Sequence, residues 1–234
     1  MKYIEKISEN SDIDSIVFSG GGIESAAAVV WAKEKGLTPL VVSISINDND
    51  AVKQMSVAAS GQAKYFGFPH YEYINTVPMA KQNANVTDTG LDLTVRLILG
   101  NPQWNIKYII TGTNAEDSFQ QRIQTRQLQR VLLARWTGQY ELSGVKMQNM
   151  KRLPIWAFPL EFLSKAEIFG MVASSYPKLL ERVWTCHTPI NNKPCLKCSK
   201  CIEYRTAKET AKRAMKRVQE GESYGAAVQG KTVE

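Results

Sequence analysis

The sequence has 234 residues, of which 44% are hydrophobic, and its formal net charge is +7. Such a chain is long enough for one domain with a substantial core. It has no run of about 18 apolar residues, so we expect no membrane-spanning helix. The N-terminus carries early acidic residues and no apolar signal core, from which we expect a cytoplasmic protein. The positive charge suits nucleotide phosphates or RNA, or serves only solubility, because the basic residues are scattered.

The first predicted element is a short apolar strand that ends at Phe18. Three glycines at 20–22 follow it, and then a helix at about 23–35. Glycines leave no β-carbon in the way of a ligand, and the N-terminus of a helix offers free N–H groups and a positive dipole end. Ser19 and Ser25 add hydroxyl groups at the two ends of the turn. The pattern predicts a phosphate-binding loop, and a tight turn without a ligand is the alternative.

Further strands and helices alternate along the rest of the chain. Strands are expected at residues 40–46, 70–75, 107–112 and 153–158. Helices are expected at about 51–66, 91–99, 117–137, 176–183 and 202–220. Another helix is expected to begin directly after Ser164. This alternation predicts an α/β fold, a single-domain doubly wound sandwich whose five-stranded sheet is mostly parallel. Ligands bind such sheets at the carboxyl ends of the strands, where the glycine turn lies.

All four cysteines lie close together near the end of the chain, at Cys186, Cys195, Cys198 and Cys201. A Cys-x-x-Cys pair places two thiolates on one metal, and four thiolates complete a closed structural zinc site. An iron–sulfur cluster, disulfides and plain buried thiols are the alternatives, and disulfides fit a cytoplasmic chain poorly. The quartet therefore predicts a structural zinc ion that fixes the last helix onto the sheet.

The glycine turn resembles the pyrophosphate loop of the N-type ATP pyrophosphatases, in which a strand is followed by Ser-Gly-Gly-x-Asp/Glu-Ser. Residues 20–25 keep this spacing and place Gly20 where a serine is usual. Together with this loop, three later stretches resemble the 7-cyano-7-deazaguanine synthases of the queuosine pathway, at 112–117, 159–168 and 184–205. The chain departs from that family after the second strand, where Ser45-Ile46-Asn47-Asp48 replaces an aromatic-and-glutamine signature.

The resemblance implies an adenine nucleotide alpha hydrolase-like fold and an ATP-dependent carbon–nitrogen ligase. Such an enzyme adenylates 7-carboxy-7-deazaguanine and converts it with ammonia to the amide and then the nitrile. ATP is a co-substrate, and Mg²⁺ would be held by Glu24 or Asp117. The implied partners are the deazapurine acid, ammonia and ATP. We expect no membrane partner and no nucleic acid, although the charge leaves the latter open, and a homodimer is one possible assembly.

The resemblance also implies roles for individual residues. The catalytic groups would be Ser25, Lys165 and Asp117. The nucleotide would be bound by the glycine turn and by residues at later strand ends: Ser19, Gly20, Gly21, Gly22, Ile23, Glu24, Ser25, Ser43, Ile44, Gly112 and Asn114. Without the resemblance, Lys165 could equally be a surface lysine in the first turn of the helix that follows Ser164.

We expect one domain over residues 1–222, with the zinc module at 184–205 inside it, and a disordered tail at 223–234. Two other functions stay open. A tRNA-thiolating enzyme of the same superfamily would adenylate a tRNA base, but it needs a catalytic cysteine outside the quartet. A non-catalytic, zinc-stabilised nucleotide-binding protein would keep the fold without turnover, and the altered position Gly20 fits that alternative.

Overall fold

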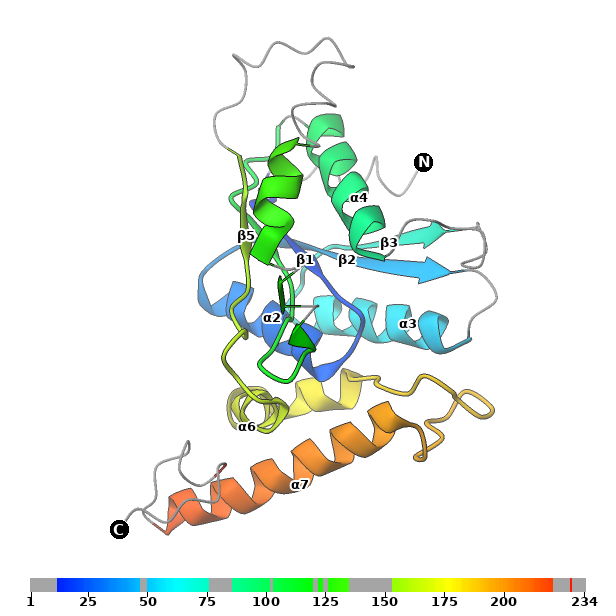
Figure 1. The fold of residues 1–234 in the computed structure, drawn as a ribbon, viewed down its shortest axis with the longest axis vertical. Coiled ribbons are helices and arrows are strands. Elements are labelled where there is room, and N and C mark those ends of the chain that lie inside the picture. The colour runs from blue at the N-terminus through cyan, green and yellow to red at the C-terminus, as the bar shows by residue number, and fades with distance from the viewer. Residues whose placement is uncertain are drawn as a thin grey trace.

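The computed structural model describes residues 12–46, 50–75, 86–101, 103–119, 122–123, 126–134, 153–220 and 228. The sheet within them has five strands in the order β3-β2-β1-β4-β5, and each neighbouring pair is parallel (Figure 1). The strands are β1 (Ser15–Phe18), β2 (Pro39–Ile46), β3 (His70–Asn75), β4 (Tyr108–Ile110) and β5 (Ile155–Ala157). The predicted parallel five-stranded sheet is confirmed.

Helices connect these strands at most of the predicted positions. They are α2 (Ile23–Glu34), α3 (Asp50–Tyr65), α4 (Val86–Gly100), α6 (Lys165–Ser175), the 3₁₀ helix η3 (Pro177–Arg182) and α7 (Ser199–Gln219). Residues 126–134 are also helical. Helix α4 begins five residues before the expected start at Leu91, because its first turn lacks the apolar periodicity that predicts a helix. The predicted tail at 223–234 lies outside the described residues, apart from residue 228.

Helices cover both faces of the sheet, as a doubly wound fold requires. Alternate strand residues point to opposite faces, so Val17 packs with α2 and α3, whereas Ile16 packs with α4. The consecutive residues Leu40, Val41 and Val42 are all fully buried, which is the pattern of a parallel strand covered on both sides. Among the described helices, none has the length and hydrophobicity to cross a membrane.

A third layer lies outside α2. Helix α6 and η3 pack against the side of α2 that faces away from the sheet, and α7 packs on the outer side of α6 (Figure 1). Ile168, Phe169 and Val172 of α6 form the centre of this contact, with Ala211 of α7 on the far side. The arrangement brings the start of α6 and the start of α7 next to the N-terminus of α2, where the glycine turn lies.

Candidate active site and metal centre

The glycine turn needs glycine at one position for steric reasons. Gly21 has φ +74°, and a β-carbon there would lie 2.3 Å from the carbonyl oxygen of Met55. Gly112, after β4, has a similar restriction, since its β-carbon would lie 2.8 Å from the backbone carbon of Glu24. Only glycine therefore allows the turn to pack on α3 and the end of β4 to approach the first turn of α2.

A buried glutamine stabilises the glycine turn through hydrogen bonds. Gln62 of α3 is fully buried, and its Nε2 donates to the carbonyl oxygens of Gly21 at 2.8 Å and Arg182 at 3.1 Å. Ser19 donates its hydroxyl to Oε1 of Gln62 at 3.2 Å and accepts from the Gly21 N–H at 3.2 Å. Ser19 and Gly21 thus shape the turn from inside. Sequence reasoning missed Gln62, whose one local signal is a polar residue among the alanines of α3.

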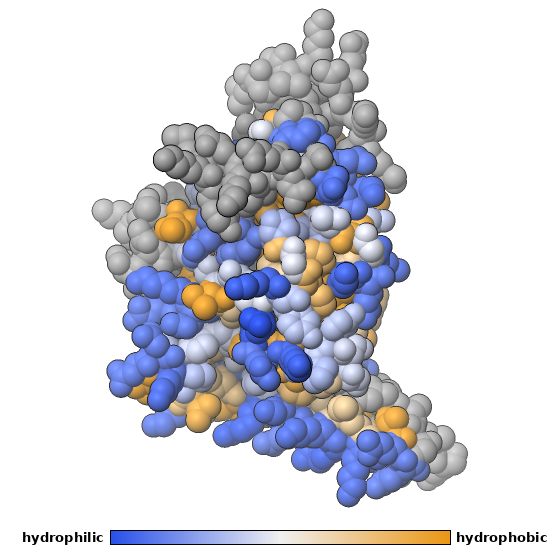
Figure 2. Space-filling view, turned by 180° about the vertical axis from the view of Figure 1, so that it is seen from behind, coloured by the Kyte–Doolittle hydropathy of each residue, from blue (hydrophilic) through white to orange (hydrophobic). Residues whose placement is uncertain are grey.

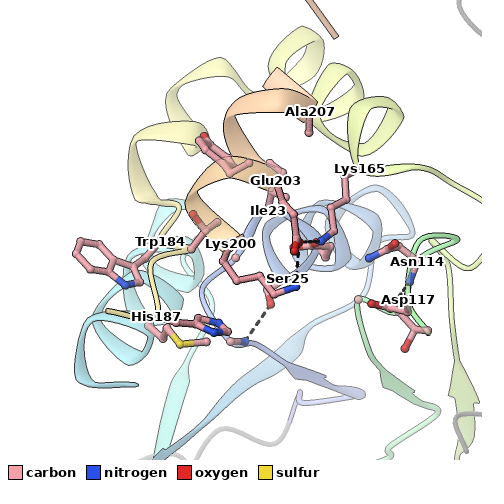
Figure 3. Close-up of a pocket in the computed structure, with 18 of the residues that line it drawn as sticks. Ile23, Ser25, Asn114, Asp117, Lys165, Trp184, His187, Lys200, Glu203 and Ala207 are labelled. Atoms are coloured by element: carbon pink, nitrogen blue, oxygen red, sulfur yellow. Dashed lines mark hydrogen bonds and ion pairs between the residues drawn. The ribbon is translucent and has the colours of Figure 1, made fainter. Parts of the chain in front are cut away.

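A cavity of about 310 Å³ lies over the N-terminus of α2 (Figure 3). Its wall contains nine of the residues proposed from the sequence: Gly20, Gly22, Ile23, Glu24, Ser25, Gly112, Asn114, Asp117 and Lys165. The further lining residues, which the sequence did not assign to the site, include Trp184, His187, Lys200 and Glu203, from the segment between η3 and the second turn of α7. These residues are far from the glycine turn in the chain, so no local pattern links them to it.

Ser25 is placed so that its hydroxyl can still donate. Its Oγ accepts a hydrogen bond from the Gly20 N–H at 2.9 Å, so its own hydrogen is not used in that bond. Gly22 is the N-cap of α2, and no side chain caps this end of the helix. The first N–H groups of α2 have no partner within the helix and are available to an anion.

Lys165 lies between two carboxylates. Its Nζ is 2.5 Å from Oε2 of Glu203 and 3.5 Å from Oε1 of Glu24, and Lys200 binds the same Glu203 oxygen at 2.9 Å. Burial alone lowers the pKa of Lys165, but the hydrogen bond to Glu203 and the nearby charges of Glu24, Glu203 and Glu116 outweigh it and raise this pKa. Lys165 therefore stays a cation inside the cavity.

The start of α6 is fixed by its own cap. The Ser164 hydroxyl accepts from the Glu167 N–H, and the Glu167 carboxylate accepts from the Ser164 N–H at 2.8 Å, which is the predicted capping box. The Glu116 carboxylate accepts from the Lys165 N–H at 2.9 Å. These bonds tie the turn after β4 to the residue that presents the lysine.

Asn114 and Asp117 form a compact turn on the part of the cavity wall next to the start of α6 (Figure 3). Asn114 is buried, its N–H donates to Oδ2 of Asp117 at 2.9 Å, and its Oδ1 accepts from the Glu116 N–H at 2.8 Å. Asp117 itself lines the cavity. Glu24 and Asp117 are the two carboxylates of this wall that suit a magnesium ion.

Ser43 and Ile44 do not line this cavity. The buried Ser43 hydroxyl is hydrogen-bonded to Ser56 at 3.0 Å and to Nε2 of His70 at 2.9 Å, on the side of the sheet that α3 covers. Ile44 packs with the core on the α4 side. Because neighbouring strand residues face opposite ways, one ligand cannot contact both side chains on the same face. Their contact with adenosine stays a prediction.

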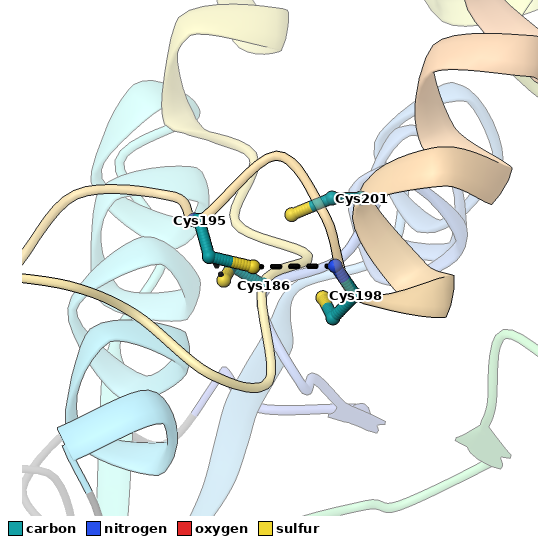
Figure 4. A group of neighbouring side chains, drawn as sticks. All are labelled: Cys186, Cys195, Cys198 and Cys201. Atoms are coloured by element: carbon teal, nitrogen blue, oxygen red, sulfur yellow. Dashed lines mark hydrogen bonds between the residues drawn. The ribbon is translucent and has the colours of Figure 1, made fainter.

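The four cysteines meet at one point beside the start of α7 (Figure 4). Their sulfur atoms all lie within 4.8 Å of one another, and Cys186 and Cys201 are buried. The Sγ of Cys195 accepts from the N–H groups of Lys197 at 3.4 Å and Cys198 at 3.3 Å. This donor set and this geometry suit a tetrahedral metal centre.

Hydrogen bonds favour the thiolate form of Cys195, one of the two half-buried cysteines of the cluster. The bond to Thr188, with those from the backbone N–H groups of Lys197 and Cys198, lowers the pKa of Cys195 to about 5. Burial raises the pKa of Cys201 to about 12 in the absence of a cation. A metal ion among the four sulfurs would supply the charge that a buried thiolate needs.

Comparisons with known proteins give only distant similarity. No protein-family model matches the chain, and no curated protein matches it. One similar solved structure is the U34-tRNA thiolase NcsA from Methanococcus maripaludis with its [4Fe-4S] cluster, at 14% identity and TM-score 0.41, covering 97% of this chain and 77% of that one. NMN synthetase from Francisella tularensis has 16% identity and TM-score 0.41, covering 100% and 87%.

A third solved structure is a predicted subunit of tRNA methyltransferase from Methanocaldococcus jannaschii. It has 15% identity and TM-score 0.37, and the match covers 68% of this chain and 73% of that one. Identities and TM-scores this low do not assign the chain to a family. The chemistry of the cavity and of the cysteine cluster is therefore the basis for a function.

Proposed function

We propose that this protein is an ATP-dependent enzyme that activates a carboxylate by adenylation, as the resemblance to 7-cyano-7-deazaguanine synthases implies. The observation that carries the proposal is the arrangement of one cavity around the uncapped N-terminus of α2. A glycine turn, the Ser25 hydroxyl and the Lys165 ammonium all line that cavity. Free N–H groups, a hydroxyl donor and a partly buried cation are groups that bind a triphosphate.

In this proposal the phosphates of ATP lie on the first turn of α2. Ser25 donates its hydroxyl to them, and Lys165 moves from Glu203 toward the negative charge that they bring. Lys165 already lies within reach of Glu24 in that first turn. Glu24 and Asp117 would hold Mg²⁺, which neutralises phosphate charge when bound. The cavity thus acts by positioning the reactants and by neutralising charge.

The acid we propose is a 7-deazapurine carboxylate. Its carboxylate oxygen attacks the α-phosphorus of ATP and pyrophosphate leaves, which gives an acyl-adenylate. Ammonia then attacks the acyl carbon, AMP leaves, and an amide forms with loss of a proton. A second adenylation on the amide oxygen, followed by loss of AMP and a proton, gives the nitrile. Asn114 and Asp117, on the cavity wall beside Lys165, are the side chains we propose to contact the acid.

We further propose that the four cysteines hold a structural zinc ion. Four sulfur ligands leave no open coordination position, so the ion would take no part in the reaction. An iron–sulfur cluster is the alternative for the same donor set. Metal analysis of the purified protein, together with its visible absorption spectrum, separates the two, because Zn²⁺ is colourless.

The test of the reaction is pyrophosphate release with mass spectrometry of the product. Wild-type protein is incubated with ATP, Mg²⁺, ammonium and 7-carboxy-7-deazaguanine, and each component is omitted in turn. We expect release only with the acid present, and a product of lower mass that contains nitrogen from ammonium. Release only with tRNA would instead indicate the tRNA-modifying alternative. Binding of ATP without any release would indicate the non-catalytic alternative.

A pair of variants ties the activity to this cavity. We expect Ser25→Ala and Lys165→Met to lower the rate of pyrophosphate release by roughly 100-fold or more, the usual scale for lost groups that stabilise transition-state charge. Lys178→Met, on the exposed surface of η3, is the matched control and keeps the wild-type rate. Full activity of both cavity variants would contradict the proposed site.

A further inference from the structure

Helix α7 carries most of the excess positive charge of this protein. It has seven lysines and arginines against two glutamates, in a chain whose net charge is +7. Of these two glutamates, Glu203 is bound by Lys165 and Lys200. The other, Glu209, is the single acid left along the outer surface of the helix.

Four of the basic residues form a stripe, which we define as Arg205, Lys208, Lys212 and Lys216. They are spaced three or four residues apart, so they lie on one face of the helix, roughly 5–6 Å from one to the next. All four side chains are exposed, and none makes an ion pair with another described residue. Hydrophilic side chains form a band along the end of the molecule where α7 lies (Figure 2).

The opposite side of α7 is already occupied. Ala207, Ala211 and Ala214 are buried, and Ala211 packs with the core that α6 and α2 form. A basic helix that enters a bilayer needs a free apolar face beside its charges. In α7 that face is used inside the protein, so the stripe favours a polyanion with regularly spaced charges over a membrane surface.

The stripe begins at the proposed active site. Lys200, Glu203, Tyr204 and Ala207 of the same helix line the cavity over α2, and Arg205 and Lys208 directly follow two of them. A chain bound along the stripe therefore has one end at the mouth of this cavity. The cavity has a volume of about 310 Å³, which is enough to admit a small group such as one unpaired base.

We propose that the stripe on α7 binds the phosphodiester backbone of a single-stranded nucleic acid that runs away from the cavity. The four cations span about 16 Å of helix, the length of about five nucleotides at the rise of one strand. This binding does not depend on the adenylation chemistry proposed above. It adds a macromolecular partner to a protein whose other proposed ligands are small molecules.

The test is binding of a fluorescein-labelled single strand, RNA in one arm and DNA of the same sequence in the other, followed by fluorescence anisotropy. The logarithm of the affinity falls linearly with the logarithm of the salt concentration, and each lysine or arginine that contacts a phosphate contributes about −0.7 to the slope. Four such contacts give a slope of about −3. We therefore expect the affinity to fall roughly 50-fold between about 50 and 200 mM salt. The arm that binds more tightly identifies the sugar of the partner.

The decisive variant replaces the whole stripe, as Arg205→Gln, Lys208→Gln, Lys212→Gln and Lys216→Gln together. Its matched control removes the same charge from exposed lysines elsewhere, as Lys33→Gln, Lys64→Gln, Lys178→Gln and Lys193→Gln. We expect the stripe variant to lose at least roughly tenfold in affinity and most of the salt slope, and the control to lose less than about threefold. Circular dichroism checks that both variants keep the helical content of the wild type.

Three outcomes would overturn the proposal. The first is that the wild type binds neither strand at low salt, and the second is that the stripe variant and the control variant lose the same affinity. The third is that the wild type binds anionic vesicles in place of nucleic acid and the stripe variant does not. Pyrophosphate release from ATP with the deazapurine acid is measured on the same samples. That assay contains no nucleic acid, so it reports on the proposed reaction alone, whereas the anisotropy assay reports on nucleic-acid binding alone.

Discussion

The Nζ atom of Lys165 lies 2.5 Å from Oε2 of Glu203, and this ion pair joins the start of α6 to the second turn of α7. Glu203 follows Cys201 by two residues, and Cys198 is the N-cap of α7. The cysteine cluster therefore lies at the point where α7 begins, within five residues of the partner of the cavity lysine. The same structural unit that stabilises the C-terminal region also sets the charge of the proposed active site.

We expect Glu203→Gln to tighten the binding of Mg²⁺-ATP. Removal of this carboxylate takes a negative charge from the cavity and releases Lys165 from its closest partner, while Glu24 still holds the lysine near α2. The expected gain in affinity is roughly three- to tenfold, since one charge near a partly buried phosphate contributes about 1 kcal/mol at a high effective dielectric constant. Isothermal titration calorimetry measures it. Glu209→Gln, outside the cavity on the same helix, is the control, and weaker binding by the Glu203 variant would contradict the prediction.

We expect Gly21→Ala to destabilise the protein far more than Gly36→Ala. Both glycines have positive φ, +74° and +68°, so alanine is strained at either position. A β-carbon at Gly21 would also collide with the Met55 carbonyl oxygen at 2.3 Å, whereas nothing lies within 4 Å of one at Gly36. We expect losses of about 3 kcal/mol or more at Gly21 and about 1 kcal/mol at Gly36, measured by urea unfolding. Equal losses would show that the turn does not pack tightly on α3.

We expect the stability to fall in mild acid because of His70. Burial lowers the pKa of His70, and the charge of Glu72 opposes this only in part. The unfolded chain then binds a proton more readily than the folded one, so stability is highest above the unfolded pKa of 6.5 and decreases as the pH falls toward the folded value. Thermal unfolding from pH 8 to pH 5 measures this. His70→Gln keeps a hydrogen-bonding side chain near Ser43 and should make the profile flatter in that range; an unchanged profile would assign the effect to other groups.

We expect removal of the metal to loosen α7. A chelator, or the variant Cys198→Ser, should lower the melting temperature by roughly 10 °C or more, because structural zinc sites contribute several kcal/mol to folding. The same treatment should also weaken ATP binding, since Lys200 and the part of the cavity wall that α7 forms lose their fixed positions. Metal analysis and thermal unfolding of the same samples check both effects. A melting temperature that does not respond to loss of the metal would mean that α7 is held by its contacts with α6 alone.

The sequence alone determined the features that depend on local patterns. Buried runs such as Leu40–Val42 predicted parallel strands covered on both faces, because only such strands are apolar without alternation. The glycines at 20–22 are adjacent in the sequence, and the four cysteines lie close together near its end. Residue type and spacing were therefore enough to predict a phosphate-binding loop and a metal site. The capping box of Ser164 and Glu167 predicted where α6 begins, and the role of Lys165 was implied by the resemblance to the 7-cyano-7-deazaguanine synthases.

Only the tertiary structure decided which distant residues meet. Gln62 under the glycine turn and Glu203 beside Lys165 carry no local signal, since a polar residue on a helix is ordinary until its neighbours are known. Ser43 was assigned to the site from its strand, but the orientation of that strand turns its hydroxyl toward Ser56 and His70. Spacing along the chain fixes element type and turn chemistry through short-range sterics, whereas the contacts in a cavity depend on how layers pack across long sequence separations.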